Sequence, residues 1–265
     1  MVHTVPDILA RIVDRKRDEL TELRGQRDEL EKRAEASTAG RRDFVRSIAR
    51  DVPSIIGEIK KASPSKGVFA ADFRPAELAK AYEAGGARAL SVLTDRIYFQ
   101  GSLADLAGAR SAVRLPVLRK DFTLDEVHVL EAAAHHADAI LLIVAVLGEK
   151  ALRHLREFAA QYSLAALVEA HDETELQMAL ASGAQIVGVN NRDLHTFEVH
   201  LQTSLDLAAR IPAGVIKVTE SGIHSRADIV QLHAAGYHAF LVGEHLMKSG
   251  DATAALRELT ADWMP

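Results

Sequence analysis

Short apolar runs alternate with longer helical segments along this chain after residue 50. Each run holds four to six residues and is rich in Val, Ile, Leu and Ala, as is typical of strands buried on both faces. The eight runs are residues 55–60, 89–93, 117–120, 139–144, 165–169, 186–190, 215–219 and 239–242. Alanine-rich segments between them, such as 75–84, 124–135 and 173–182, predict helices.

Eight strand–helix units in succession predict parallel strands with the helices outside. Units of 20 to 35 residues suit an α/β protein of the (β/α)8 class, a TIM barrel. A doubly wound open sheet is the structural alternative. No glycine-rich dinucleotide turn follows the first run, and this favours the barrel.

The first 50 residues have a different pattern, with 12 Lys or Arg and 10 Asp or Glu. Apolar residues recur there at three- and four-residue steps, which predicts an amphipathic helix starting near Pro6 and Asp7. They are Ile8, Leu9, Ile12, Val13, Leu20 and Leu23. Residues 31–42 lose this period and are expected to form a loop. The segment is either a solvated charged helix packed on the core or a lid element near an active site.

Composition narrows the class of protein. Hydrophobic residues make up 48% of the 265 residues and charged residues 26%, which excludes disordered and collagen-like chains. The formal net charge is −5, so the basic excess of a nucleic-acid-binding module is missing and no nucleic-acid partner is expected. The chain has no Cys, which excludes disulfides, thiolate nucleophiles and cysteine-held metal sites.

The sequence predicts neither a membrane-spanning nor a secretory segment. Its longest stretch without polar residues, 139–147, is far shorter than the about 20 residues of a membrane helix. Charges interrupt the N-terminus where a signal peptide has its apolar core. We therefore expect a cytoplasmic protein with no membrane partner. The 12 His form no HExxH or His-x-His motif, so no metal site is expected.

Polar side chains end six of the eight runs. Such groups at the ends of buried strands are costly unless they are paired or functional. A single one is more often a structural salt bridge, but in a barrel these ends meet at the face that carries active sites. Six together therefore predict an active site at this rim. Glu58 and Lys60 are two residues apart, so their side chains point the same way and are expected to form an ion pair.

Glycines follow the last two runs. Gly222 comes after the seventh and Gly243 after the eighth, where barrels often hold a phosphate through backbone N–H groups. Glycine lets the backbone approach such an anion closely. Glu244 would contribute only its N–H, and its carboxylate is expected to point away.

Seven strings of the chain resemble indole-3-glycerol phosphate synthases of tryptophan biosynthesis, in the family's order. They are GEIKKASPSKG (57–67), LSVLTD with YFQGS (90–102), VLRKDF (117–122), LVEAHDE (167–173), VGVNNRDLHTFEV (187–199), VTESGI (218–223) and FLVGEHLM (240–247). The resemblance implies a (β/α)8 catalytic barrel over residues 51–265. It also implies that residues 1–50 form a helical extension capping the active-site face. His200 and His245 depart from the family pattern, outside the catalytic set.

The family's reaction would convert 1-(2-carboxyphenylamino)-1-deoxyribulose 5-phosphate to indole-3-glycerol phosphate, carbon dioxide and water. The ring carbon that bears the carboxylate would attack the ribulose carbonyl, and no cofactor or metal would be used. The only partner implied is this phosphorylated small molecule. The protein itself is expected to be a monomer or weak dimer.

The resemblance also implies roles for single residues. Lys120 would protonate the carbonyl oxygen as general acid, and Glu169 would act as general base in the dehydration. Lys60 would bind the substrate carboxylate and serve as a second acid, and Glu58 would position it. The remaining implied site residues are Asn190, Arg192 and Ser221 as hydrogen-bonding groups, Ser63, Gly222, Gly243 and Glu244 at the phosphate, and Phe99, Phe122 and Leu141 around the aromatic ring.

Other functions remain open on the residues alone. Another phosphate-binding barrel, such as phosphoribosylanthranilate isomerase or the tryptophan synthase α subunit, is one, although the isomerase would want a Cys. A Schiff-base aldolase could use Lys120. A barrel kept as a binding or scaffold protein would be expected to lose Lys120, Glu169 or Glu58, and all three are present.

Overall fold

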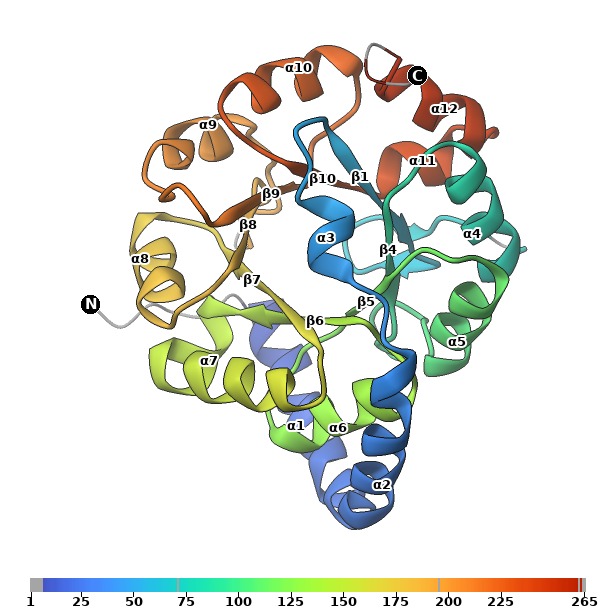
Figure 1. The fold of residues 1–265 in the computed structure, drawn as a ribbon, viewed down its shortest axis with the longest axis vertical. Coiled ribbons are helices and arrows are strands. Elements are labelled where there is room, and N and C mark those ends of the chain that lie inside the picture. The colour runs from blue at the N-terminus through green and yellow to red at the C-terminus, as the bar shows by residue number, and fades with distance from the viewer. Residues whose placement is uncertain (1–6, 71, 195, 262, 264–265) are drawn as a thin grey trace.

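Eight parallel strands close into one barrel in the computed structural model, which describes residues 7–70, 72–194, 196–261 and 263 (Figure 1). The strands are β1 (Ser54–Ile59), β4 (Ala89–Leu93), β5 (Val117–Lys120), β6 (Ala139–Ile143), β7 (Ala165–Ala170), β8 (Ile186–Asn190), β9 (Ile216–Glu220) and β10 (Ala239–Val242). The ring closes because β1 pairs with β10 through Ser54 and Ala239, and with β4 through Ile56 and Ala89. The predicted (β/α)8 barrel is confirmed.

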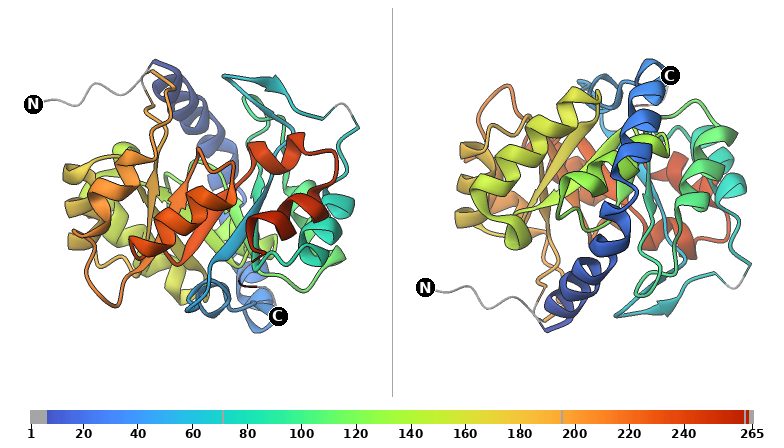
Figure 2. Two further views of the ribbon diagram at one scale, coloured as in Figure 1. Left: turned by 90° about the horizontal axis from the view of Figure 1, so that it is seen from above. Right: turned by 90° about the horizontal axis from the view of Figure 1, so that it is seen from below.

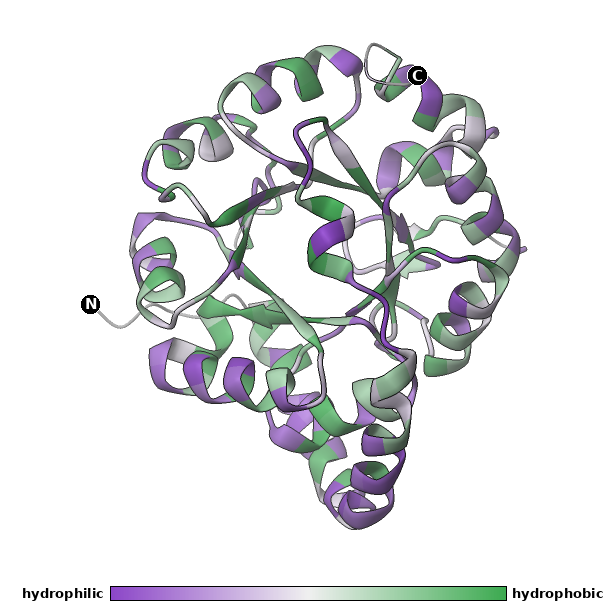
Figure 3. Ribbon diagram, in the orientation of Figure 1, coloured by the Kyte–Doolittle hydropathy of each residue, from purple (hydrophilic) through white to green (hydrophobic). Residues whose placement is uncertain are grey.

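Helices surround the barrel, and most of them begin at a capping side chain. Asp125, Asp172 and Ser225 each accept a hydrogen bond from a first-turn N–H of the helix that follows. The helices are α4 (Pro75–Ala84), α5 (Leu103–Ala112), α6 (Glu126–Ala134), α7 (Val144–Gln161), α8 (Glu173–Ala181), α9 (Gln202–Ala208), α10 (Arg226–Ala234), α11 (Glu244–Lys248) and α12 (Ala252–Leu259). Figure 3 shows that hydrophobic residues dominate the strands and that hydrophilic ones gather on the outer helices. Among the described residues, no helix combines the length and the hydropathy needed to span a membrane.

Apolar side chains fill the barrel and close its amino-terminal end. Leu118, Leu141 and Leu167 point inward and pack in one cluster with Phe44 and Ile48. These last two belong to α3 (Phe44–Ile48), which lies across the mouth of the barrel in Figure 1. The polar strand ends at the opposite rim therefore stand on an apolar floor.

The segment before the barrel runs along its outside from one end to the other. It consists of α1 (Asp7–Arg24), α2 (Arg27–Ser37), the 3-10 turn η1 (Thr38–Gly40) and α3, and Figure 2 shows it crossing the barrel wall. The predicted start of the first helix at Asp7 is confirmed, whereas Pro6 lies outside the described residues. A two-stranded hairpin, β2 (Ala62–Ser63) and β3 (Gly67–Val68), follows β1.

The expectation of a loop over residues 31–42 is wrong for residues 31–37, because α2 continues to Ser37, whereas residues 41 and 42 lie outside helices and strands. Leu30 and Ala34 are buried, and the Ser37 hydroxyl donates to the carbonyl of Ala133 in α6 at 2.7 Å. A helix that packs through one leucine and small residues shows little apolar period. Tertiary contact with α6 therefore stabilises a helix whose sequence is nearly all polar.

A buried carboxylate fastens the end of this segment to the barrel. Asp138, at 1% exposure, accepts the backbone N–H of Arg42 at 2.8 Å and pairs with Arg110 at 2.9 Å. Arg41 donates to the carbonyl of Ala137, and Arg42 donates to that of Leu115 at 2.6 Å. Several charged hydrogen bonds to buried groups thus act together, and they fix the end of this segment at one position on the barrel.

Candidate active site

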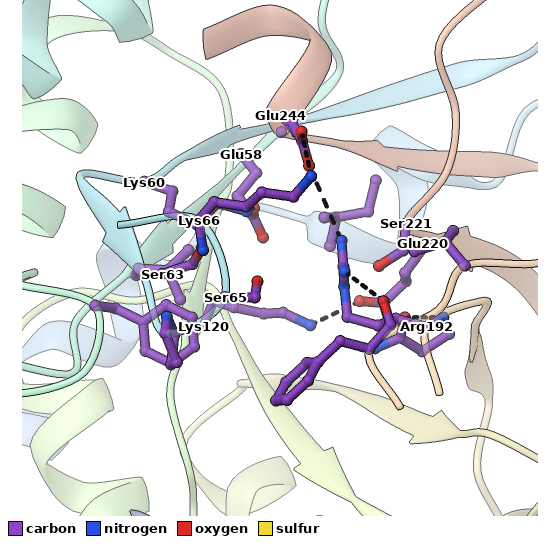
Figure 4. A pocket seen from close by; sticks show the side chains of 18 of the residues that line it. Glu58, Lys60, Ser63, Ser65, Lys66, Lys120, Arg192, Glu220, Ser221 and Glu244 are labelled. Atoms are coloured by element: carbon purple, nitrogen blue, oxygen red, sulfur yellow. Dashed lines mark hydrogen bonds and ion pairs between the residues drawn. The ribbon is translucent and has the colours of Figure 1, made fainter. Parts of the chain in front are cut away.

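A cavity of about 480 Å³ opens at the carboxyl-terminal rim of the barrel. All 14 residues that the sequence singled out line it, as Figure 4 shows for several of them. They come from β1, from β5 to β10 and from loops that follow the strands, including the loop after β4 for Phe99 and the middle of β6 for Leu141. The barrel thus brings together residues that are up to 186 positions apart, from Glu58 to Glu244.

An ion pair stands at the end of β1. Lys60 Nζ lies 2.5 Å from Glu58 Oε1, as the spacing of these residues predicts. Lys60 Nζ is also 5.3 Å from the centroid of the Phe69 ring. Gly243 on the neighbouring strand end makes room for this pair, because a Cβ there would lie 2.4 Å from Glu58 Oε1. The need for space thus gives Gly243 a second role beside its predicted phosphate contact.

Lys120 lies between two carboxylates at the bottom of the cavity. Its Nζ is 2.7 Å from Glu169 Oε2 and 2.6 Å from Glu220 Oε2, and all three side chains are largely buried. Burial opposes the charge of Lys120, but the two carboxylates outweigh it and raise the pKa of Lys120 above its usual value. Lys120 is therefore an ammonium group in the ligand-free site.

The two carboxylates differ in protonation although they share one cation. Burial opposes the charge of Glu169, yet Lys120 keeps the pKa of Glu169 well below its usual value. For Glu220, burial raises the pKa to about 7, with Lys120 opposing the rise and the charge of Glu169 adding to it. Pairs of carboxyl groups with pKa values pushed apart are typical of acid–base sites.

Glu220 is a site residue that the sequence left without a role. Its only signal was its place at a strand end. Its Oε1 is buried and has no hydrogen-bond partner among the described residues. Gly188 on β8 accommodates it, because a Cβ there would lie 2.4 Å from that oxygen. A buried acceptor without a partner is costly in a folded protein and suits a group that meets a ligand.

Asn191, the residue after the predicted site residue Asn190, holds the turn that follows β9. Asn191, not Asn190, is the buried amide, and it donates to Thr219 Oγ1 and to the carbonyl of Ser221, both at 3.0 Å. Ser221 has φ +65° and Gly222 φ +80°, so two successive residues are left-handed. A Cβ at Gly222 would lie 2.5 Å from Val199, which adds a steric reason for the glycine.

Cations gather at the glycine end of the cavity. Lys66 Nζ lies 3.5 Å from Glu244 Oε1, and Arg192 Nη2 lies 4.0 Å from Glu244 Oε2. The expectation that the Glu244 carboxylate points away is wrong, since both of these cations line the cavity. Lys248, one helical turn on, also bonds Glu244 at 2.6 Å. Three positive side chains thus surround this carboxylate at the glycine end of the cavity.

Helix α1 forms an apolar wall of the cavity. Ile8, Leu9 and Ile12 line it together with the aromatic rings of Phe99 and Phe122, whose centroids are 6.3 Å apart. Of the two interpretations of this helix, that of a solvated appendage is inconsistent with these contacts.

A buried lysine attaches α1 to the catalytic rim. Lys16, at 5% exposure, pairs with Asp121 at 2.9 Å and with Asp95 at 3.4 Å. Asp121 directly follows Lys120, and it also accepts the hydroxyl of Thr94 at 2.5 Å. The position of α1 is therefore tied to the end of the strand that carries Lys120.

The sequence matches the model of a family described as indole-3-glycerol phosphate synthase over residues 9–259. It is 52% identical over 258 residues to a protein of that name from Aromatoleum aromaticum, covering 96% of this chain and 98% of the relative. A protein of the same name from Burkholderia vietnamiensis is 47% identical over 257 residues, with the same coverage of each chain.

Solved structures with low sequence identity share the fold. A mutant tryptophan synthase alpha-subunit from Pyrococcus furiosus matches with a TM-score of 0.60 at 15% identity, covering 78% of this chain and 98% of that one. Thiamine phosphate pyrophosphorylase from the same organism gives a TM-score of 0.59 at 16% identity, with 79% and 94% covered. These likenesses concern the barrel alone.

Proposed function

The chain belongs to the indole-3-glycerol phosphate synthase family, and from that membership we propose how its own residues carry out the reaction. The chain is a carboxy-lyase of tryptophan biosynthesis that forms indole-3-glycerol phosphate. Its substrate is a phosphorylated small molecule that also carries an aromatic ring and a carboxylate. The observation that carries the proposal is Lys120, held as an ammonium between Glu169 and Glu220 in a cavity with one apolar side.

The cavity offers a place for each part of this substrate. The phosphate lies at the glycine end, where it meets the N–H groups of Gly222, Gly243 and Glu244 and the hydroxyl of Ser63. Arg192, Asn190 and Ser221 bind the sugar chain by hydrogen bonds. The aromatic ring lies against Phe99, Phe122 and Leu141, and its carboxylate faces Lys60. This placement fixes the substrate at both ends and brings its carbonyl group to Lys120.

Ring closure uses Lys120 as the acid. The ring carbon that bears the carboxylate forms a bond to the ketone carbon, and the carbonyl oxygen takes a proton from Lys120. The positive charge left on the ring and its nitrogen is stabilised by the buried carboxylates of Glu58 and Glu220. An ammonium group suits this step, whereas a Schiff-base aldolase would need a neutral amine at Lys120.

Decarboxylation and dehydration complete the reaction. The carbon–carboxylate bond breaks, its electron pair restores the aromatic ring, and the apolar side of the cavity favours loss of the charged group as carbon dioxide. Lys60 then protonates the departing hydroxyl, which leaves as water, while Glu169 takes a proton from the carbon next to the nitrogen. Glu58, 2.5 Å from Lys60, holds that lysine in place.

The segment before the barrel supplies the cover of the site. We divide the chain into residues 1–50, an extension that caps the rim through α1, and residues 51–265, the catalytic barrel. We propose a monomer or weak dimer as the active form. A phosphorylated biosynthetic intermediate as substrate supports a cytoplasmic location.

A fluorescence assay tests the function directly. Purified protein is mixed with 1-(2-carboxyphenylamino)-1-deoxyribulose 5-phosphate, and the indole product is followed by its emission. Formation of indole-3-glycerol phosphate is the expected result, and folded protein that forms none would contradict the function. A crystal soaked in phosphate tests the binding mode, because the anion is expected at Gly222 and Gly243 and should compete with substrate.

A further inference from the structure

His171 lies directly after β7 and links the proposed general base to the start of α8. Its Nε2 is 3.3 Å from Glu169 Oε1, and its Nδ1 is 2.9 Å from Glu175 Oε2. Lys120 occupies the other oxygen of Glu169, Oε2. The carboxylate of Glu169 is therefore flanked by a lysine on one oxygen and an imidazole on the other.

The imidazole is hydrogen-bonded on the side of Glu175, whereas on the side of Glu169 it has a 3.3 Å contact without a hydrogen bond. Glu175 Oε2 accepts both Nδ1 and the backbone N–H of His171, the latter at 2.8 Å. Glu175 is itself fixed in the first turn of α8, where its N–H donates to Asp172 at 2.8 Å. In contrast, Nε2 is buried and makes no hydrogen bond of good geometry among the described residues. A buried donor without a bond has a cost that a change at Glu169 can remove.

We propose that His171 is a positioning residue for Glu169, an imidazolium anchored on Glu175 that keeps this carboxylate ionised and oriented when Lys120 turns to the substrate. This inference rests on the proposed function, in which Lys120 gives up its proton before Glu169 acts as base. Once Lys120 is a neutral amine, Glu169 needs another cation. The Glu169 carboxylate then turns toward Nε2 and completes the missing hydrogen bond.

The charges around the pair support a protonated ring. Burial opposes the charge of His171, but Glu169 and Glu175 outweigh it and raise its pKa to about 10. Among the described residues, Lys120 from β5 lies against Glu169, and Glu220 from β9 shares that lysine. Of all these groups, Lys120 and His171 are the cations. A cation beside a carboxylate lowers the pKa of that carboxylate, so loss of His171 raises the pKa of Glu169.

Two substitutions separate the charge of His171 from its hydrogen bond. His171→Leu removes both, and His171→Gln keeps a neutral N–H donor near the position of Nε2. For the leucine variant we expect kcat to fall about 10- to 100-fold, less than the about 10²–10⁴-fold of a lost acid–base catalyst, with KM within about threefold. In both variants the acidic limb of the pH profile of kcat moves upward by about one unit. The glutamine variant recovers most of kcat at high pH.

A surface pair provides the matched control. His154 Nε2 lies 2.8 Å from Glu126 Oε1 on the outside of the barrel, so His154→Leu removes a similar contact and should leave kcat and its pH profile unchanged. An acidic limb that does not move in either His171 variant overturns the proposal, whatever happens to stability. If His171→Leu does not fold, His171→Gln decides through the same limb. Activity of the parent protein is measured first, so failure of the proposed function is seen separately.

Discussion

Replacement of Lys120 by methionine tests both the chemistry and the charge balance of the site. Methionine keeps an unbranched apolar side chain, one atom shorter than that of lysine, but removes the proton donor, so kcat should fall by about 10²–10⁴-fold, the contribution of general acid catalysis. The carboxylate and phosphate contacts of the substrate remain, and KM should change by no more than a few fold. The rate is measured by the fluorescence of indole-3-glycerol phosphate.

The same substitution should destabilise the protein in a pH-dependent way. In the parent protein, Lys120 Nζ lies 2.7 Å from Glu169 Oε2 and 2.6 Å from Glu220 Oε2. The substitution therefore removes the cation that these two carboxylates share. Removing one partner from a buried ion pair costs about 3–5 kcal/mol. Above about pH 7 the parent has both carboxyl groups ionised. Without Lys120 two buried carboxylates would repel each other, so we expect the folded variant to keep one proton that the unfolded chain releases. The variant should therefore lose a further 1.4 kcal/mol, roughly, for each pH unit from 7 to 9.

Lys217→Met is the matched control for this prediction. Lys217 lies near the start of β9, whereas Glu220 ends that strand, and its Nζ donates to the carbonyl of Ala208 at 2.6 Å. Its replacement should leave kcat within about threefold of the parent and add no loss of stability between pH 7 and 9. Lys120→Met with a kcat within threefold of the parent would refute its role as general acid. An equal stability loss at both pH values would refute the shared-cation reasoning.

Three further predictions concern the walls of the site. Gly243→Ala should lower kcat/KM about tenfold or more, because the new Cβ displaces the Glu58 carboxylate of the β1 ion pair. As a control, Gly108→Ala, in open space on α5, should keep activity and raise the free energy of unfolding in denaturant by up to about 1 kcal/mol. Deletion of residues 1–40 should mainly raise KM. It should also lower Tm somewhat, because each buried apolar side chain that is uncovered costs about 1.5–3 kcal/mol. Unchanged KM and kcat would mean that α1 does not form a wall of the site. Lys16→Met should cost about 3 kcal/mol and raise KM, while the exposed Lys32→Met should do neither, and equal effects of the two would contradict the anchoring role.

The barrel and its rim could be predicted because both follow from short-range pattern. Buried parallel strands are continuous apolar runs, so a charged residue that ends such a run is conspicuous. Lys120, Glu169 and the pair of Glu58 and Lys60 were visible in this way. All of them line one cavity because parallel strands end on the same side.

The features that escaped prediction depend on contacts between distant parts of the chain. The helix over Arg27–Ser37 is nearly all polar and is stabilised by its fit to α6. The direction of the Glu244 carboxylate depends on Lys66 and Arg192, which come from two other loops. Glu220 gained its significance from the space left by a glycine on the neighbouring strand. None of these relations leaves a periodic trace in the sequence.

The strap formed by α1, α2 and α3 has a consequence for the synthesis of the protein. These helices leave the ribosome first, but Ser37 and Arg42 bond to groups 96 residues further along the chain. At about 5–20 residues per second, these partners emerge some 5–20 s later, roughly. The buried face of α3 lacks its packing partners for longer still, because the cluster to which it belongs includes Ala239 of the last strand. The dense charge of α1 and α2 suits this interval, because it keeps a segment without its docking surface hydrated and apart from other nascent chains.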